Sequence, residues 1–247
     1  MRQFGLIGYP LGHSFSKKYF SEKFAAENID AAYELYPLEN IGLFTELINN
    51  QKLSGLNVTI TYKEQVIPFL HEIDDTAREI GAVNVIKFIE TDNKTLLKGY
   101  NSDTLGFSRS IAPMLQKQHT GALILGTGGA SKAIEYSLRK LGLSTTYGSR
   151  KSTENTLSYK DLTPEIIQKH KVIVNCTPLG MEPANDTFPD IPYGAIGTDH
   201  LLYDIVYKPA ETVFMQKGRA QGATVINGLE MLYGQAEAAW KIWNTNE

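Results

Sequence analysis

Lys63 follows a short β-rich run in the stretch 55–64, GLNVTITYKE. Most lysines are solvated surface charges, but a lysine just past the end of a strand can enter a cleft. There its ammonium group can stabilise the negative charge that develops on a carbonyl oxygen and donate a proton to it. A carboxylate would orient such a lysine, and Asp103 in GYNSDTLGF is the candidate. An aspartate beside a helix start is also a routine N-cap, so the residue types alone leave both interpretations open.

Three further polar residues interrupt or border apolar segments. Ser14 and Ser16, in GYPLGHSFSKKYF, stand two apart at the junction of a predicted strand and a predicted helix. Hydroxyls at that spacing can face one polar ligand, but each is more typical of a helix N-cap. Asn84 interrupts the apolar run GAVNVI, where a buried amide needs hydrogen-bond partners. His13 has no partner at metal-ligand spacing, so no metal site is predicted.

A glycine-rich turn gives the clearest sign of a cofactor. In ALILGTGGAS a buried-type strand ends, Gly126, Gly128 and Gly129 follow, and a helix begins. Glycines there permit a tight turn and let backbone N–H groups approach a pyrophosphate at the helix N-terminus. The third position of this fingerprint usually holds glycine or alanine, and here it holds Ser131. The strand before, the helix after and the strand STTYG that follows favour a dinucleotide site over an ordinary strand–helix turn.

The loop after that second strand indicates which dinucleotide. NAD sites usually place an acidic side chain there to hold the ribose 2′-hydroxyl. This chain has Ser149, Arg150 and Lys151 instead, with Glu154 close behind. Two cations attract a 2′-phosphate that an acid would repel, so NADP is favoured over NAD.

Strands alternate with helices along the chain, which predicts α/β architecture with mainly parallel sheets. The pattern restarts near Gly121, which indicates two units. Strands are expected at 3–8, 31–38, 55–60, 121–125, 144–150, 170–180, 200–207 and 223–228, and a strand pair in 82–103 turns at Asp92, Asn93 and Lys94. Helices are expected at 16–28, 41–50, 104–118 (disturbed by Pro113), 129–143, 211–222 and 229–243.

Composition narrows the class of protein. The 247 residues carry a formal net charge of -3 and no block of basic residues, so neither nucleic acid nor a membrane surface is an expected partner. One cysteine, Cys176, excludes an internal disulfide framework. No long apolar run or leader-like segment is visible, and a cytoplasmic protein is expected.

Taken together, the motifs resemble the shikimate dehydrogenase family along essentially the full chain. They are GYPLGHSFS, NVTITYKE, GAVNVI, GYNSDTLGF, GTGGASKA, NCTPLGM, YDIVYKP and NGLEMLYGQA. The resemblance implies reversible NADPH-dependent reduction of 3-dehydroshikimate to shikimate, a step toward chorismate and the aromatic amino acids. It implies an α/β substrate domain (1–103 and 229–247) and a Rossmann-type NADP domain (104–228), with the C-terminal helix returning to the first domain. A small-molecule substrate and a monomer or homodimer are expected.

The resemblance also implies a role for each matching residue. Lys63 would be the catalytic lysine and Asp103 its partner. The substrate-binding residues would be Ser14, Ser16, Thr59, Asn84, Asp103, Tyr207 and Gln235. The cofactor-binding residues would be Gly126, Thr127, Gly128, Gly129, Ala130, Ser149, Arg150, Lys151, Thr177, Ile205 and Gly228.

This chain departs from the family pattern at three places. Thr61 replaces a proline before Lys63, and Asp75 stands where many members have glutamate. Glu154 stands where a second arginine is usual, and Lys151 could replace that charge. An NAD-linked quinate/shikimate dehydrogenase, a folate-linked dehydrogenase of related architecture and a catalytically dead sensor are the alternatives. The loop cations, the paired serines and the presence of both catalytic residues argue against them.

Overall fold

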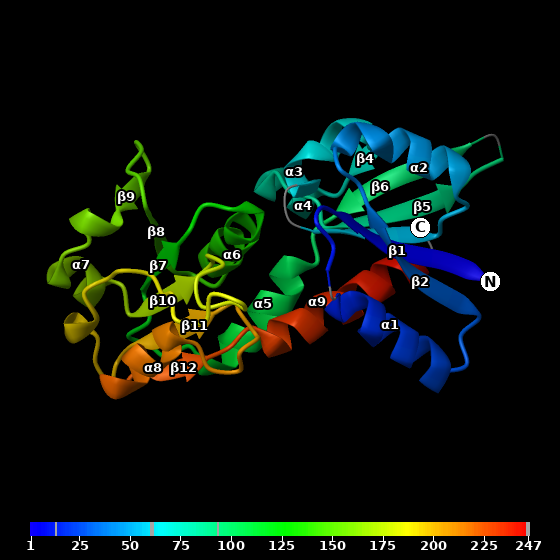
Figure 1. Cartoon of the computed structure of the whole chain (residues 1–247). Coiled ribbons are helices and arrows are strands. Elements are labelled where there is room, and N and C mark those ends of the chain that lie inside the picture. The colour runs from blue at the N-terminus through cyan, green and yellow to red at the C-terminus, as the bar shows by residue number, and fades with distance from the viewer. Residues whose placement is uncertain (13, 60–61, 93, 246–247) are drawn as a thin grey trace. The chain divides into compact units, whose positions relative to one another are not determined.

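The chain divides into two compact units, and the computed structural model describes residues 1–12, 14–59, 62–92 and 94–245 (Figure 1). The first unit contains Met1–Ser102 and Ala236–Glu247, and the second contains Asp103–Gln235. The chain returns to the first unit within helix α9 (Leu229–Asn244). The features predicted at His13, Ile60, Thr61 and Asn93 lie outside the described residues.

The first unit is built on one mixed sheet with the strand order β2-β1-β3-β5-β6-β4. Strand β1 is parallel to β2 and β3, whereas β5 is antiparallel to β3 and forms a hairpin with β6. The hairpin was predicted, but it makes this sheet mixed where the alternation predicted mainly parallel strands. A two-stranded hairpin needs no crossover helix, so strand–helix alternation does not reveal it. The strands are β1 (Arg2–Gly8), β2 (Ala31–Pro37), β3 (Gly55–Val58), β4 (Glu72–Ile73), β5 (Val85–Glu90) and β6 (Thr95–Tyr100).

Helices cover both faces of this first sheet. They are α1 (Phe15–Ala26), η1 (Ile41–Leu43), α2 (Phe44–Asn50), α3 (Tyr62–Gln65), η2 (Ile67–Phe69), α4 (Asp75–Ile80) and the end of α9. Successive side chains of a strand point to opposite faces. Phe4 and Val85 accordingly pack with α1 and α9, whereas Ile7 and Leu56 pack with α2, α3 and α4. Figure 1 shows these two helical layers on opposite sides of the sheet.

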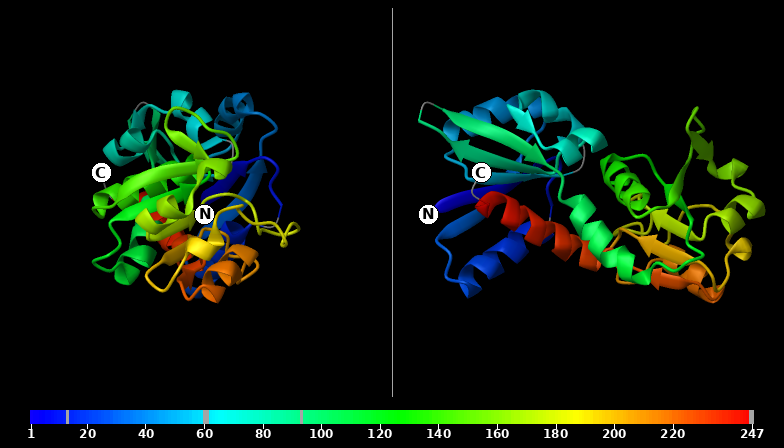
Figure 2. Two further views of the ribbon diagram at one scale, coloured as in Figure 1. Left: turned by 90° about the vertical axis from the view of Figure 1, so that its left-hand side faces the viewer. Right: turned by 180° about the vertical axis from the view of Figure 1, so that it is seen from behind.

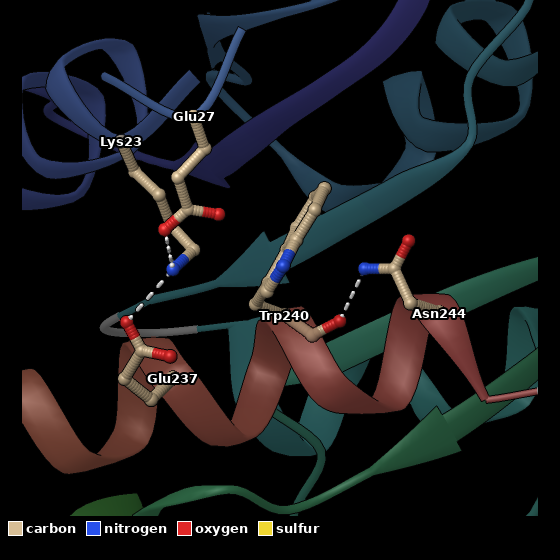
Figure 3. Close-up of polar contacts among 5 residues, drawn as sticks. All are labelled: Lys23, Glu27, Glu237, Trp240 and Asn244. Carbon is tan, nitrogen blue, oxygen red and sulfur yellow. Dashed lines mark hydrogen bonds and ion pairs between the residues drawn. The ribbon is translucent and has the colours of Figure 1, made fainter. Parts of the chain in front are cut away.

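Aromatic and ionic contacts hold the second half of α9 in the first unit. The buried Trp243 ring lies 4.7 Å from the ring of Phe4. Lys23 on α1 donates to Glu27 at 2.7 Å and to Glu237 of α9 at 3.2 Å, as Figure 3 shows. The C-terminal helix therefore packs against α1 in this unit.

The second unit contains a wholly parallel sheet with the order β12-β11-β10-β7-β8-β9. The chain enters at the central β7, runs outward through β8 and β9, and returns to β10 on the other side of β7. This is a doubly wound sheet, and its topological switch point lies between β7 and β10. Figure 2 shows the strands with helices on both sides. The strands are β7 (Gly121–Leu125), β8 (Ser144–Ser149), β9 (Thr156–Ser158), β10 (Val172–Asn175), β11 (Leu201–Asp204) and β12 (Thr224–Ile226).

Two hydrophobic cores flank this second sheet. On one face Ile124 packs with α5, α6 and the start of α9, and on the other Leu123 packs with α7 and α8. The predicted helix at 104–118 ends early: α5 stops at Ile111 and a 3₁₀ turn contains Pro113, which has no N–H for the helical ladder. The helices are α5 (Asp103–Ile111), η3 (Ala112–Met114), α6 (Gly129–Lys140), η4 (Tyr159–Asp161), α7 (Pro164–Lys169), η5 (Tyr193–Ala195) and α8 (Val213–Ala220). The predicted α/β class with two units is confirmed.

Candidate active site

Lys63 lies in the short helix α3, which follows strand β3 in the chain. Its backbone oxygen accepts a hydrogen bond of 2.7 Å from the N–H of Val83, which ties α3 to the segment that leads into β5. The neighbouring Tyr62 is buried and donates its hydroxyl to the backbone oxygen of Leu38 at 2.6 Å. The backbone that carries Lys63 is therefore held by two other segments of the first unit.

Thr59 lies where β1 and β3 end side by side. Its N–H donates to the backbone oxygen of Ile7 at 3.0 Å. A methyl group added to Gly8 would stand only 2.5 Å from the Cγ2 of Thr59. Glycine at position 8 thus allows the threonine to sit directly against β1, and the turn that leads to Ser14 starts from this point.

Ser14 and Ser16 have different structural roles. Ser14 is the N-cap of α1, and its hydroxyl oxygen accepts from the N–H of Lys17 at 3.4 Å, which confirms the predicted cap. Ser16 lies inside the helix, so the cap interpretation is wrong for it. Its side chain instead reaches the hydroxyl of Tyr33, whose pKa burial raises. Tyr33 in turn donates to the Oδ1 of Asn57 at 2.7 Å.

Asn84 is buried and its amide is held in one orientation. Its Oδ1 accepts from the N–H of Ser102 at 2.7 Å and from the Ser102 hydroxyl at 3.3 Å. Its backbone oxygen accepts from the Nδ2 of Asn57 at 3.4 Å. One polar network therefore joins Ser16, through Tyr33 and Asn57, to Asn84. Sequence reasoning missed the two connecting residues, and the signal for Asn57 was a polar residue inside the short strand β3.

Asp103 is the first residue of α5 and is 5% exposed, whereas the sequence placed it just before a helix. A carboxylate in the first turn of a helix is stabilised by the helix dipole. Asp103 belongs to the second unit and Lys63 to the first.

The glycine turn after β7 has the geometry that a pyrophosphate needs. Gly126 has φ +106, a conformation that other residues rarely adopt. Gly128 is the N-cap of α6, and a methyl group added to it would meet nothing within 4 Å. The 12-residue helix α6 has no acidic residue in its first turn, so no carboxylate of that turn competes with an anion for its N–H groups and dipole. The turn, with Thr127 and Ala130 between and after its glycines, fits a bound anion.

Ser131 occupies the third position of the glycine fingerprint, and its hydrogen bonds show how a serine is accommodated there. Its side chain is fully buried and donates to the backbone oxygen of Gly128 at 2.6 Å. Its own backbone oxygen accepts from the Tyr147 hydroxyl at 3.2 Å. The hydroxyl is thus satisfied inside the turn, and serine serves there as a small residue.

Arg150 and Lys151 follow β8, the strand next to β7, and both are exposed. None of the ion pairs among the described residues involves either cation. The exposed Glu154 lies in the same loop. Arg150 is close enough to Tyr159 to lower the pKa of that phenol, although burial has the larger, opposite effect. These cations stand on the strand neighbouring the glycine turn, where an adenosine 2′-phosphate would lie.

Four of the predicted cofactor residues form two close pairs after strands β7, β10, β11 and β12. A methyl group added to Gly126 would stand 3.0 Å from the Cγ2 of Thr177, so the turns after β7 and β10 touch. Gly228 packs directly on the backbone of Ile205, because an added methyl group would lie 2.6 Å from the Ile205 carbonyl carbon. The side chain of Tyr207, two residues further on, is 36% exposed.

Gln235 lies on α9 in the second unit, where that helix crosses α5 at very short range. A methyl group added to Gly106 of α5 would meet the backbone oxygen of Met231 and would stand 2.8 Å from the Gln235 N. The close approach of the two backbones therefore sets where α9 carries Gln235.

A buried polar group near these loops was not predicted. Asp204 ends β11, is 0% exposed and accepts hydrogen bonds from Asn175 at 3.0 Å and from Thr212 at 2.5 Å. Burial raises the pKa of Asp204 to about 6, against the effect of these hydrogen bonds. Burial likewise raises the pKa of Cys176 well above its ordinary value, so its thiol is no ready nucleophile. The signal in the sequence was a single polar residue in each of two apolar strands.

The described part of the chain contains neither a candidate membrane span nor a candidate metal-binding cluster. No helix there is long and apolar enough to cross a membrane. No three histidine, cysteine, aspartate or glutamate side chains in the same ranges gather in a way that could hold a metal ion.

Comparison with known proteins gives consistent matches. Residues 6–86 match the family profile described as the shikimate dehydrogenase substrate binding domain. The chain is 33% identical to the shikimate dehydrogenase (NADP(+)) of Methanosphaera stadtmanae over 97% of this chain and 90% of that protein. The crystal structure of shikimate dehydrogenase from Aquifex aeolicus has a TM-score of 0.86 and 33% identity and covers 98% of this chain and 92% of its own. The Thermus thermophilus shikimate 5-dehydrogenase in complex with NADP(H) and shikimate has a TM-score of 0.86 and 26% identity, with coverage of 99% and 94%.

Proposed function

Because this chain belongs to the shikimate dehydrogenase family, we propose that it catalyses the reversible NADPH-dependent reduction of 3-dehydroshikimate to shikimate. The observation that carries the proposal is the glycine turn at the switch point of a doubly wound sheet, with Arg150, which forms no ion pair among the described residues, just after the neighbouring strand β8. The first unit, which contains the matched residues 6–86, would bind the substrate. The second unit would bind NADP. The proposed substrate domain contains residues 1–103 and 229–247, and the proposed NADP domain contains residues 104–228.

Lys63 is proposed as the acid–base group. The bound cofactor supplies or accepts the hydride. Reduction builds negative charge on the carbonyl oxygen, and the ammonium of Lys63 would stabilise this charge and donate its proton. In the reverse direction the neutral amine would accept the proton of the substrate hydroxyl. Support comes from the backbone of α3, which the bond to Val83 holds in place.

Asp103 is proposed as the partner of Lys63. A carboxylate near the lysine would orient it and could also accept a bond from a neighbouring substrate hydroxyl. The same carboxylate would favour the charged amine, so removal of water on substrate binding must oppose it if Lys63 is to act as a base. The 5% exposure of Asp103 indicates a side chain largely removed from water before any ligand binds.

The hydroxyls and carboxylate of the substrate would be bound by polar residues from both units. In the first unit these are Ser14, Ser16, Thr59 and Asn84, and in the second they are Asp103, Tyr207 and Gln235. The fixed amide of Asn84 and the network that ties it to Ser16 support this assignment, because donors that are already oriented lose little entropy when a ligand binds.

NADP would be bound by the carboxyl edge of the parallel sheet. The pyrophosphate would lie on residues 126–130, and the 2′-phosphate would contact Arg150 and Lys151, beside Ser149. Thr177, Ile205 and Gly228 would line the nicotinamide end. The cations are exposed and have no carboxylate partner among the described residues, so a phosphate would gain charge-assisted hydrogen bonds without breaking an ion pair. We further propose a monomer or homodimer working in the cytoplasm, where a biosynthetic dehydrogenase meets its substrates.

The test is oxidation of shikimate by the purified protein, followed by the absorbance of the reduced nicotinamide. NADP and NAD are supplied in parallel, each with shikimate and with quinate. A rate that requires shikimate and prefers NADP supports the proposal. A rate with NAD alone would refute the role of Arg150 and Lys151, and a preference for quinate would refute the substrate. Lack of any reaction with all four pairs would refute the proposed function.

A further inference from the structure

Asp204 is a carboxylate buried at the carboxyl end of β11, and its hydrogen bonds join three segments of the second unit. Its Oδ1 accepts from the Nδ2 of Asn175 and from the N–H of Val206, each at 3.0 Å. Its Oδ2 accepts from the Thr212 hydroxyl at 2.5 Å. Asn175 ends β10, Val206 lies in the loop after β11, and Thr212 caps α8. The carboxylate is thus the common acceptor for these segments.

Among the residues that the structure describes, no cation pairs with this buried carboxylate. None of the ion pairs among the described residues includes Asp204. Cys176 and Tyr193 are ionisable neighbours of Asp204. Burial raises the pKa of each, and the negative charge of Asp204 raises it further. Both are therefore neutral near pH 7. A buried carboxylate without a cation is unfavourable for folding, so stability alone does not explain this residue.

Asn175 connects Asp204 to the loop that contains Thr177. While its Nδ2 donates to Asp204, the Oδ1 of Asn175 accepts from the Thr177 N–H at 3.0 Å and from the Thr177 hydroxyl at 2.6 Å. The Thr177 hydroxyl oxygen also accepts from the N–H of Leu179 at 3.3 Å. The hydroxyl of Thr177 is therefore used inside its own loop, and its methyl group lies against Gly126. Thr177 can offer a ligand a fixed shape rather than its hydroxyl proton.

We propose that Asp204 is a positioning residue for the dinucleotide site. Through Asn175 it fixes the loop that carries Thr177, and through the Val206 N–H it fixes the loop that carries Ile205. This inference rests on the proposed function, because those loops are the ones assigned to the nicotinamide end of NADP. Asp204 itself need not touch the cofactor.

The physical effect is preorganisation. A loop that is already held in its bound conformation loses little conformational entropy when the ligand arrives, and the binding free energy is larger by the amount saved. Without the carboxylate, the Nδ2 of Asn175 would keep only its longer bond of 3.3 Å to the backbone oxygen of Leu179, and the acceptor of the two bonds that orient Thr177 would be less firmly fixed. The dissociation constant of NADPH would then rise even though none of its direct contacts has been removed.

The test compares alanine substitutions at Asp204, the last residue of β11, and at His200, the residue just before that strand. Asp204→Ala removes the acceptor at the carboxyl end. The control, His200→Ala, removes a buried side chain at the other end, whose Nδ1 accepts from the Gly197 N–H at 3.0 Å. The dissociation constant of NADPH is measured by fluorescence titration of each folded protein. Asp204→Ala is expected to raise it about tenfold, and His200→Ala should change it by less than about twofold.

Two further variants show whether Asp204 acts through Asn175. Asp204→Asn keeps an oxygen for Asn175 and Val206 and should bind NADPH nearly as well as the wild type. Asn175→Ala should weaken NADPH binding as much as Asp204→Ala does. The double variant should bind NADPH no more weakly than either single variant, since both substitutions break the same connection between Asp204 and Asn175. If Asp204→Ala does not fold, as thermal unfolding would show, Asn175→Ala alone carries the test.

Three results would overturn the inference: equal losses in Asp204→Ala and His200→Ala, an unchanged dissociation constant in a folded Asn175→Ala, or additive effects in the double variant. The readout does not depend on turnover. A wild-type protein that binds NADPH but does not oxidise shikimate would refute the proposed function and leave this comparison intact. A wild-type protein that does not bind NADPH would overturn both.

Discussion

Replacing Asp204 by asparagine should change the pH dependence of stability in one direction. Burial raises the pKa of Asp204 to about 6 in the folded protein. The pKa of a carboxyl in an unfolded chain is about 4, and each pH unit of difference corresponds to about 1.4 kcal/mol. The ionised carboxylate therefore lowers the free energy of unfolding by about 3 kcal/mol relative to the protonated one.

Because the pKa of Asp204 is raised on folding, the protein should become less stable as the pH rises. Stability from this group is fully present below the unfolded pKa and is lost as the pH rises through about 6. Asparagine has no such proton. The wild type should thus lose stability relative to Asp204→Asn by about 2 kcal/mol between about pH 4.5 and about pH 8, because part of the loss has already occurred at the lower pH.

Urea unfolding of both proteins at a series of pH values measures this difference. All other carboxylates are common to the two chains, so their titration cancels in the subtraction. A difference that stays flat with pH would refute the raised pKa. A difference of opposite sign would mean that the bonds from Asn175, Val206 and Thr212 stabilise the anion more than burial destabilises it.

Three other substitutions test separate parts of the structure. Gly106→Ala should lower the free energy of unfolding by about 1–3 kcal/mol, since its methyl group would meet the backbone of α9. In the control Gly197→Ala the added group meets nothing within 4 Å, so the free energy of unfolding should change by less than about 0.5 kcal/mol. Equal losses of stability in urea unfolding of the two variants would contradict the close contact between α5 and α9. Arg150→Ala should weaken the binding of NADP by about 10- to 100-fold and the binding of NAD much less. The control Lys160→Ala, at an exposed lysine, should change the affinity for neither cofactor. Equal losses of affinity for NADP and NAD in ligand titrations of Arg150→Ala would show that Arg150 does not recognise the 2′-phosphate. Gln235→Ala should mainly raise the KM for shikimate in steady-state kinetics, and an unchanged KM would mean that α9 does not reach the substrate.

Local chemistry made much of the fold predictable. The apolar strand before Gly126 and the glycines after it determine a strand, a turn and a helix start without help from distant residues. Likewise Ser14, placed before an apolar–polar helical pattern, was predicted as a cap and caps α1. The two-unit α/β organisation followed from the restart of the pattern near Gly121.

What the sequence did not reveal depends on contacts between distant segments. Helices α4 and α7 were missed because each has only six residues, too few for a clear period, and their caps lie in polar stretches. Asp103 was expected just before a helix but is its first residue, since helix ends are set by the final hydrogen-bond pattern. The network of Asn175, Asp204 and Thr212 joins residues up to 37 positions apart, and no local pattern relates them.

The central claim is that Lys63 transfers a proton during NADP-linked oxidation of shikimate. The most direct measurement compares the turnover of the wild type, Lys63→Ala and the control Lys52→Ala, an exposed lysine of the same unit, and determines shikimate affinity by titration. We predict that turnover falls by roughly two to four orders of magnitude in Lys63→Ala alone, with shikimate affinity little changed. Near-normal turnover of Lys63→Ala on shikimate with NADP would contradict the account.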